Sequence, residues 1–142
     1  MANFPIALLD EAIRLCPEPL VTLQAELHPY LDQSKLIAAC RARGLVYTAY
    51  CPLGRGRILK DPVLGEIARR KGKTIAQVAL RWLIQKGIVA PIPRSSNTER
   101  MAQNLDVFDF VLSDDEMARI DALKRPDGRI ANPAGRVPPW DV

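Results

Sequence analysis

Short apolar runs alternate with helical segments along this sequence, which predicts an α/β fold built on a parallel sheet. Two further observations support this class. Capping signals mark where several helices begin, and the connections between elements are short, as in βαβ units with right-handed crossovers. The composition, with 142 residues of which 48% are apolar and 25% charged, fits one domain with a single core.

The first part of the chain predicts two strands and two helices. An opening helix after Pro5 has its apolar stripe at four positions: Ile6, Leu9, Ile13 and Cys16. Residues 20–27 and 45–50 are the two predicted strands. The helix between them carries Leu36, Ile37 and Cys40 on its apolar side, and we expect it to stop at Gly44.

The remaining part predicts one strand, at residues 88–93, among four helices, after a loop at residues 51–59. The helix starts are marked as follows: a cap at Asp61 before Pro62, a capping box of Thr74 with Gln77, Thr98, and a second capping box of Ser113 with Glu116. A tail rich in Pro and Gly, residues 126–142, is expected to lie along the surface. Three strands are too few for a closed (β/α)₈ barrel, which needs eight strands and typically ~250 residues.

Charge and composition exclude several classes of protein. The formal charge of +4 fits a small anionic ligand, and the eight aromatic residues are not interleaved with basic clusters as in single-strand nucleic-acid binders. No apolar run reaches the ~20 residues of a membrane span, and the acidic amino terminus is unlike a signal peptide, so we expect a cytoplasmic protein without membrane or nucleic-acid partners. Cys16, Cys40 and Cys51 are expected to be buried thiols, without a disulfide or a metal.

The most informative loop follows the third predicted strand. Arg94 and Ser95 precede a helix start, where free N–H groups favour an anion. Arg100, Gln103 and Asn104 stand at i, i+3 and i+4, so one helix face offers a charge for a phosphate and two amides for a purine edge. On spacing alone, a solvated polar helix face is the commoner explanation.

Residues 91–110, PIPRSSNTERMAQNLDVFDF, resemble the signature with which aldo-keto reductases bind the adenosine 2′-phosphate and the adenine of NADP(H). The resemblance implies that Arg94, Ser95 and Arg100 are phosphate ligands. It implies adenine contacts for Gln103 and Asn104.

Two further segments are similar to the same family. AYCPLGRGRIL, residues 49–59, implies that Tyr50 lies under the nicotinamide and Leu53 beside the pyrophosphate. LQAELHPYLDQ, residues 23–33, implies that Gln24 binds the carboxamide. Without the resemblance, Tyr50 would be interpreted as a packed strand-end aromatic. Asn3 corresponds to the family's Ser-Asn-Phe segment, with Ala2 in place of the serine, and we expect it to be frayed.

The resemblance extends along the chain, and NPAGRVPPWD, residues 132–141, is similar to the tail of the bacterial 2,5-diketogluconate reductase branch. It implies a single domain, residues 1–142, comprising the last three β/α units of a (β/α)₈ TIM barrel and a tail from residue 126. The family's Asp, Tyr, Lys and His tetrad comes from its first four strands, so we expect a truncated chain with no catalytic residues and no activity alone. A small carbonyl substrate is implied only where missing strands are supplied.

His28 is expected to be a structural hydrogen-bonding residue. Two hypotheses follow for the whole chain. The first is an NADPH-dependent oxidoreductase part that keeps the cofactor site. The second is a non-catalytic module that binds dinucleotides or anions, or that self-associates through exposed sheet edges near Val21 and Ile92.

Overall fold

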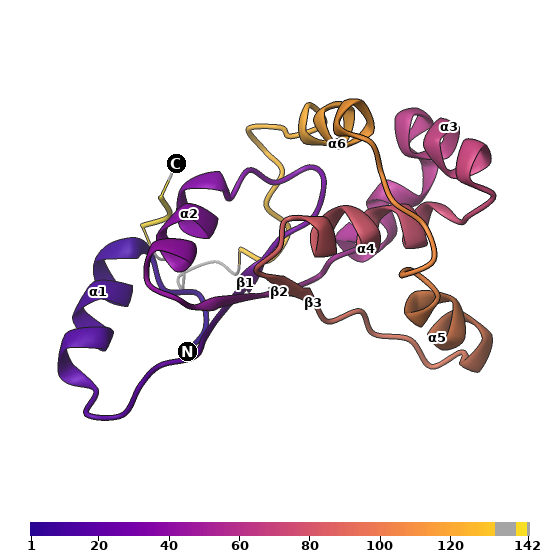
Figure 1. The fold of residues 1–142 in the computed structure, drawn as a ribbon. Coiled ribbons are helices and arrows are strands. Elements are labelled where there is room, and N and C mark those ends of the chain that lie inside the picture. Colours follow the sequence, from indigo (N-terminus) through magenta and orange to yellow (C-terminus); the bar gives the residue numbers. More distant parts are fainter. Residues whose placement is uncertain (133–138, 142) are drawn as a thin grey trace.

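The computed structural model describes residues 1–132 and 139–141, and its centre is a parallel three-stranded sheet in the order β1-β2-β3 (Figure 1). The strands are β1, Thr22–Glu26, β2, Val46–Tyr50, and β3, Val89–Pro91. Gln24 is aligned with Thr48, and Thr48 with Ala90. The predicted α/β class and the three parallel strands are confirmed, although each strand is shorter than predicted. Within the described residues the sheet does not close into a barrel.

Every predicted helix is present. The α-helices are α1, Ile6–Leu15, α2, Ser34–Ala42, α3, Pro62–Lys71, α4, Ile75–Gln85, α5, Thr98–Leu105, and α6, Asp114–Asp121. Both predicted capping boxes form, and the Asp61 side chain accepts from Val63 N and Leu64 N at the start of α3. The predicted loop at 51–59 needs correction, because it contains a 3₁₀ segment, η1, Gly54–Lys60. None of the described helices has the length and apolarity needed to cross a bilayer.

Helices α2 and α4 cover one face of the sheet (Figure 1). Alternate strand residues such as Leu23, Tyr47 and Ala49 point into that core and are fully buried. The expected stripe of α1 is only partly buried, because α1 lies beside the outer edge of the sheet: Leu9 is buried, but Ile13 is 39% exposed.

The cysteine prediction holds in part. All three thiols are free, and Cys40 is buried. Cys16 and Cys51 are partly exposed, because one ends α1 and the other lies in the turn after β2.

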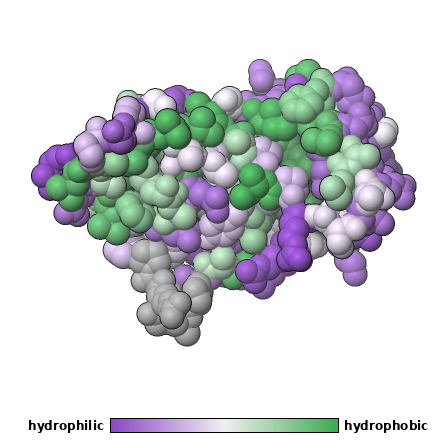
Figure 2. All heavy atoms as spheres, turned by 90° about the horizontal axis from the view of Figure 1, so that it is seen from below, coloured by the Kyte–Doolittle hydropathy of each residue, from purple (hydrophilic) through white to green (hydrophobic). Residues whose placement is uncertain are grey.

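No helix among the described residues covers the opposite face of the sheet. This face presents Gln24, Val46, Thr48, Tyr50 and Ala90, and the view from that side shows apolar and polar residues interleaved (Figure 2). Val46 is 44% exposed there.

The two edges of the sheet are β1 and β3, as expected, but both are protected against further pairing. Asn3 is not frayed, contrary to expectation: Asn3 N donates to Gln24 O at 2.8 Å, and Gln24 N donates to Met1 O at 2.9 Å. At the other edge, the outward-facing positions 91 and 93 are both proline and have no N–H to offer. Strand addition is therefore restricted at both edges.

The described part of the tail is held at the carboxyl end of β1 by the buried carboxylate of Glu26. Its Oε1 accepts from Ile130 N at 2.8 Å and its Oε2 from Ala131 N at 2.9 Å. His28 Nε2 lies 3.1 Å from Oε1. Burial tends to raise the pKa of Glu26, but the hydrogen bonds from His28, Ala131 and Ile130 outweigh it and hold the pKa below its ordinary value. Residues 133–138 and 142 of the predicted tail lie outside the described residues.

We expect Glu26→Gln to destabilise the chain by about 1–3 kcal/mol, because a neutral amide cannot accept from three donors and leaves a buried N–H unpaired. Urea denaturation measures this, with the exposed Glu18→Gln as matched control. Because the folded pKa of Glu26 is lowered, its contribution should be complete above its unfolded pKa and lost as the pH falls through the folded pKa. If Glu26→Gln lost as much stability at acid pH as the wild type does, this assignment would be contradicted.

We also expect the purified chain to self-associate through the helix-free face and not through strand pairing, because that face exposes apolar side chains beside two protected edges. Val46→Lys should shift the species in sedimentation velocity towards monomer. Val111→Lys, at an exposed position outside the sheet, is the control. A stable wild-type monomer at micromolar concentration would refute the prediction.

Candidate functional site

Six of the residues that the sequence singles out lie around one cavity of about 520 Å³ between η1 and α5. They are Leu53, Arg94, Ser95, Arg100, Gln103 and Asn104. Leu53 arrives from the turn after β2, and the other five come from the segment that follows β3. The cavity therefore lies beyond the carboxyl ends of two neighbouring parallel strands, where α/β folds place their ligands.

The start of α5 forms the charged end of this cavity. Asn97 caps the helix, accepting from Arg100 N at 2.9 Å. Ser95 Oγ accepts from Asn97 N at 3.1 Å, which fixes the turn between β3 and α5. Within the described part of the chain, Arg94 and Arg100 are exposed and form no ion pair. Two uncompensated guanidinium groups thus stand at the positive end of a helix dipole.

The opposite wall is apolar. Leu53, Leu59 and Ile75 line it, and Leu53 and Ile75 also pack against the main core. Gln103 and Asn104 lie one turn further along α5 and are partly buried. The cavity consequently has a cationic end, an amide-bearing face and an apolar wall.

Asn3, Gln24 and Tyr50 form a second group on the helix-free face of the sheet. Tyr50 OH donates to Asn3 Oδ1 at 2.9 Å, and the backbone of Asn3 pairs with that of Gln24. Burial, followed by the negative charge of Glu26, raises the pKa of Tyr50. Asn3 has a left-handed backbone, with φ of 58°, which asparagine tolerates better than most residues.

These two groups do not share a cavity. Tyr50 is not among the residues that line the space beside Leu53, although three positions separate them in sequence. The turn at residues 50–53 connects the two groups. A ligand that contacted both would have to extend along this turn.

Glu26 and Arg129 are additional residues near Tyr50 that the sequence interpretation missed. Arg129 Nη1 lies 3.9 Å from Glu26 Oε2, and its guanidinium stacks 3.6 Å from the centroid of the Trp140 ring. The sequence signal that could have revealed Glu26 was its spacing from His28. Residues two apart at a strand end share a face, so the carboxylate and the imidazole could have been expected to interact.

His28 has the structural role expected for it. It is fully buried, and its Nδ1 lies 3.3 Å from Tyr30 N, which makes Nδ1 the acceptor and leaves the proton on Nε2 for Glu26. Among the described residues, no group of three His, Cys, Asp or Glu side chains could hold a metal ion.

Comparison with known proteins gives consistent matches. Aldo-keto reductase family 1 member A1 of Mus musculus is 39% identical over 135 residues, which cover 88% of this chain and 41% of that protein. A crystal structure of a putative 2,5-diketo-D-gluconic acid reductase B superposes with a TM-score of 0.96 at 44% identity, over 99% of this chain and 50% of that one. A Bombyx mori aldo-keto reductase in complex with NADP has a TM-score of 0.80 at 34% identity, over 87% and 43% of the two chains.

This chain thus spans about two-fifths to a half of the length of these proteins. Its residues 1–125 also match the sequence profile described as the Aldo/keto reductase family. That match covers most of the sequence and includes both groups of site residues, so the chain belongs to the aldo/keto reductase family.

Proposed function

We propose that this chain is the NADP(H)-binding part of an NADPH-dependent carbonyl reductase with a (β/α)₈ barrel, and that the cavity between η1 and α5 receives the adenosine 2′-phosphate end of the cofactor. The observation that carries the proposal is the convergence on one cavity of Leu53 with five residues of the segment after β3. Solved relatives bound to NADP(H) support the choice of cofactor.

The phosphate would be held by Arg94, Ser95 and Arg100. Guanidinium groups bind phosphate oxygens through two parallel N–H bonds, and neither arginine has a competing carboxylate among the described residues. The Ser95 hydroxyl accepts from Asn97 N at 3.1 Å and donates to Asn97 O at 3.3 Å, so it would have to turn its proton from that carbonyl to a phosphate oxygen. The dipole of α5 adds to the attraction.

The adenine would lie between the amides of α5 and the apolar wall. The side-chain amides of Gln103 and Asn104 each offer N–H donors and a carbonyl acceptor. This combination matches the edge of a purine, which also carries donors and acceptors. Leu53 stands where the chain turns from this cavity towards Tyr50, so it suits a position beside the pyrophosphate.

The nicotinamide would be positioned by Asn3, Gln24 and Tyr50. Asn3 Oδ1 is occupied by the Tyr50 hydroxyl, which leaves its amide protons for the carboxamide oxygen. Gln24 presents its amide on the same face of the sheet, and the Tyr50 ring provides a surface for stacking. When bound, the cofactor supplies a hydride for a carbonyl carbon. The chain's own residues bind and orient it.

The proton that a carbonyl reduction also needs would come from residues outside these 142. The hydroxyls of Tyr30 and Tyr47 are already used, by Asp61 Oδ2 and by the Glu26 carbonyl. Burial, followed by the contact with Asp61, raises the pKa of Tyr30 to about 12, and burial raises that of Tyr47 well above its ordinary value. Both shifts oppose proton donation near neutral pH. We propose a small aldehyde, ketone or keto-sugar acid as substrate of the complete barrel.

The alternative is a module that binds anions without catalysis. Its support is the exposed pair Arg94 and Arg100 at a helix start, a feature that also suits simple phosphates. Contacts to the adenosine distinguish this anion module from a cofactor site. A cofactor site needs Gln103, Asn104 and Leu53 as well as the two arginines.

We expect NADP⁺ to bind more tightly than NAD⁺, and Arg100→Ala to erase that preference, because a charge-assisted phosphate contact is worth roughly 1.5–3 kcal/mol, or about 10- to 100-fold. Calorimetric titration of both nucleotides measures it, with the exposed Arg14→Ala as control. Equal binding of NADP⁺, NAD⁺ and inorganic pyrophosphate would favour the anion module. Unchanged selectivity in Arg100→Ala would contradict the phosphate assignment.

We further expect the isolated chain to show no carbonyl reductase activity, since a positioned general acid contributes about 10²- to 10⁴-fold and is missing here. The assay follows NADPH absorbance with a panel of aldehydes and keto acids. Turnover that copurifies with the chain and disappears in Tyr50→Ala would disprove this. Recovery of activity on adding a polypeptide with the missing strands would support it.

A further inference from the structure

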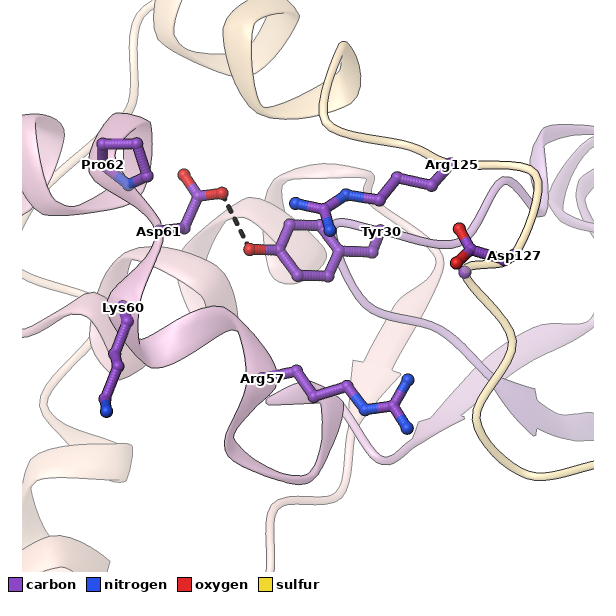
Figure 3. A pocket seen from close by; sticks show the side chains of 8 residues that line it. Tyr30, Arg57, Lys60, Asp61, Pro62, Arg125 and Asp127 are labelled. Atoms are coloured by element: carbon purple, nitrogen blue, oxygen red, sulfur yellow. Dashed lines mark hydrogen bonds between the residues drawn. The ribbon is translucent and has the colours of Figure 1, made fainter.

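A second cavity also borders η1 (Figure 3). Its volume is about 310 Å³, at the lower end of the range for small-molecule sites. Three segments far apart in sequence build it. Tyr30 follows β1, Arg57 and Lys60 belong to η1, and Arg125 and Asp127 follow α6.

The floor of this cavity is formed by Tyr30 and Asp61, whose side chains are hydrogen-bonded to each other. Tyr30 OH donates to Asp61 Oδ2 at 2.8 Å, while Asp61 Oδ1 accepts from the first N–H groups of α3. The charge of Asp61 is therefore already balanced by a phenol and a helix amino terminus. Tyr30 and Asp61 are both buried, so the floor is rigid.

The walls carry positive charge without a partner. Among the described residues, none of Arg57, Lys60 and Arg125 has an ion pair, and Arg125 instead stacks 4.0 Å from the centroid of the Tyr30 ring. This contrasts with lysines elsewhere, because Lys71, Lys73, Lys86 and Lys124 all contact carboxylates within 3 Å. Asp127 is the remaining acid of the cavity, so cations outnumber free carboxylates.

We propose that this cavity is a second anion site, which binds a small oxyanion with two or more charges, such as a phosphate or a polycarboxylate. Figure 3 shows the Arg125 guanidinium over the Tyr30 ring and the Arg57 side chain extending along the other side of that ring. Two planar guanidinium forks suit an oxyanion that presents several oxygens. Lys60, at the far end of the cavity, adds a flexible charge.

Segment η1 is the wall shared by the two cavities. Leu59 lines the proposed cofactor pocket, whereas Arg57 and Lys60 line the second cavity. Arg55 and Gly56 have positive φ, so η1 bends between its two turns. An oxyanion joining Arg57 to Arg125 would fix η1 against the segment after α6. This coupling to the cofactor depends on the proposed function, but the binding of the anion does not.

The test is a nuclear magnetic resonance titration of the full chain with inorganic phosphate and, separately, with citrate, both without nucleotide. Amide resonances of Arg57, Lys60 and Gly128 should shift with saturation. Arg57→Gln should weaken that binding about tenfold, and Arg14→Gln should leave it unchanged. Arg125→Lys, which keeps the charge and loses the fork, should weaken it while the spectrum stays that of a folded chain. Saturation by phosphate but not citrate would assign a phosphate site, and the reverse a carboxylate site.

Phosphate is also expected near Arg100, and Arg100→Ala separates the two sites. That variant should lose shifts around α5 and keep those at Arg57 and Gly128. A failure of the proposed cofactor site would thus leave the second site intact. The proposal is overturned if neither anion shifts Arg57 or Gly128, or if Arg57→Gln binds as tightly as the wild type.

Discussion

The buried carboxylate of Glu26 is the interaction on which the rest of the structure depends. Its side chain binds the His28 ring and two backbone N–H groups of the tail, while its carbonyl accepts from Tyr47 OH and Gln33 Nε2. One residue thereby joins β1, β2, the start of α2 and the tail. A charge buried to this depth is tolerated because each oxygen has strong donors, and removing any donor would leave it uncompensated. The carboxyl end of β1, beside Tyr50, is consequently held by contacts from several elements.

The proposed cofactor cavity is assembled on less constrained elements. Segment η1 and the start of α5 are held by turns and caps, and their arginines remain without carboxylate partners in the part of the chain that the structure describes. This difference between a firmly held sheet and less constrained loops suits ligand binding. A rigid sheet fixes where the loops begin, and exposed charged side chains remain free to reorganise around a phosphate.

The sequence predicted local features well and distant ones poorly. Capping boxes at Thr74 and Ser113 depend on residues three apart, so spacing alone was sufficient. Arg94 and Ser95 lie just before α5, and the shared face of Arg100, Gln103 and Asn104 follows from helical geometry. The position of Leu53 in the same cavity depends on another loop and was suggested by family resemblance. The anchoring of the tail at Glu26 was missed, because its partners are backbone N–H groups 104 and 105 residues away, which carry no sequence signature.

The contact between the two ends of the described chain has a consequence for how the protein folds. Helix α1 has no side-chain cap of its own, and Ile6 N donates instead to Asp141 Oδ2, across 135 residues, at 2.8 Å. Closing so long a loop costs conformational entropy that local turns do not incur. The amino-terminal partner of α1 therefore costs more conformational entropy to place than a cap from a neighbouring residue would. The first helix of the chain is thus completed by the last residue that the structure describes.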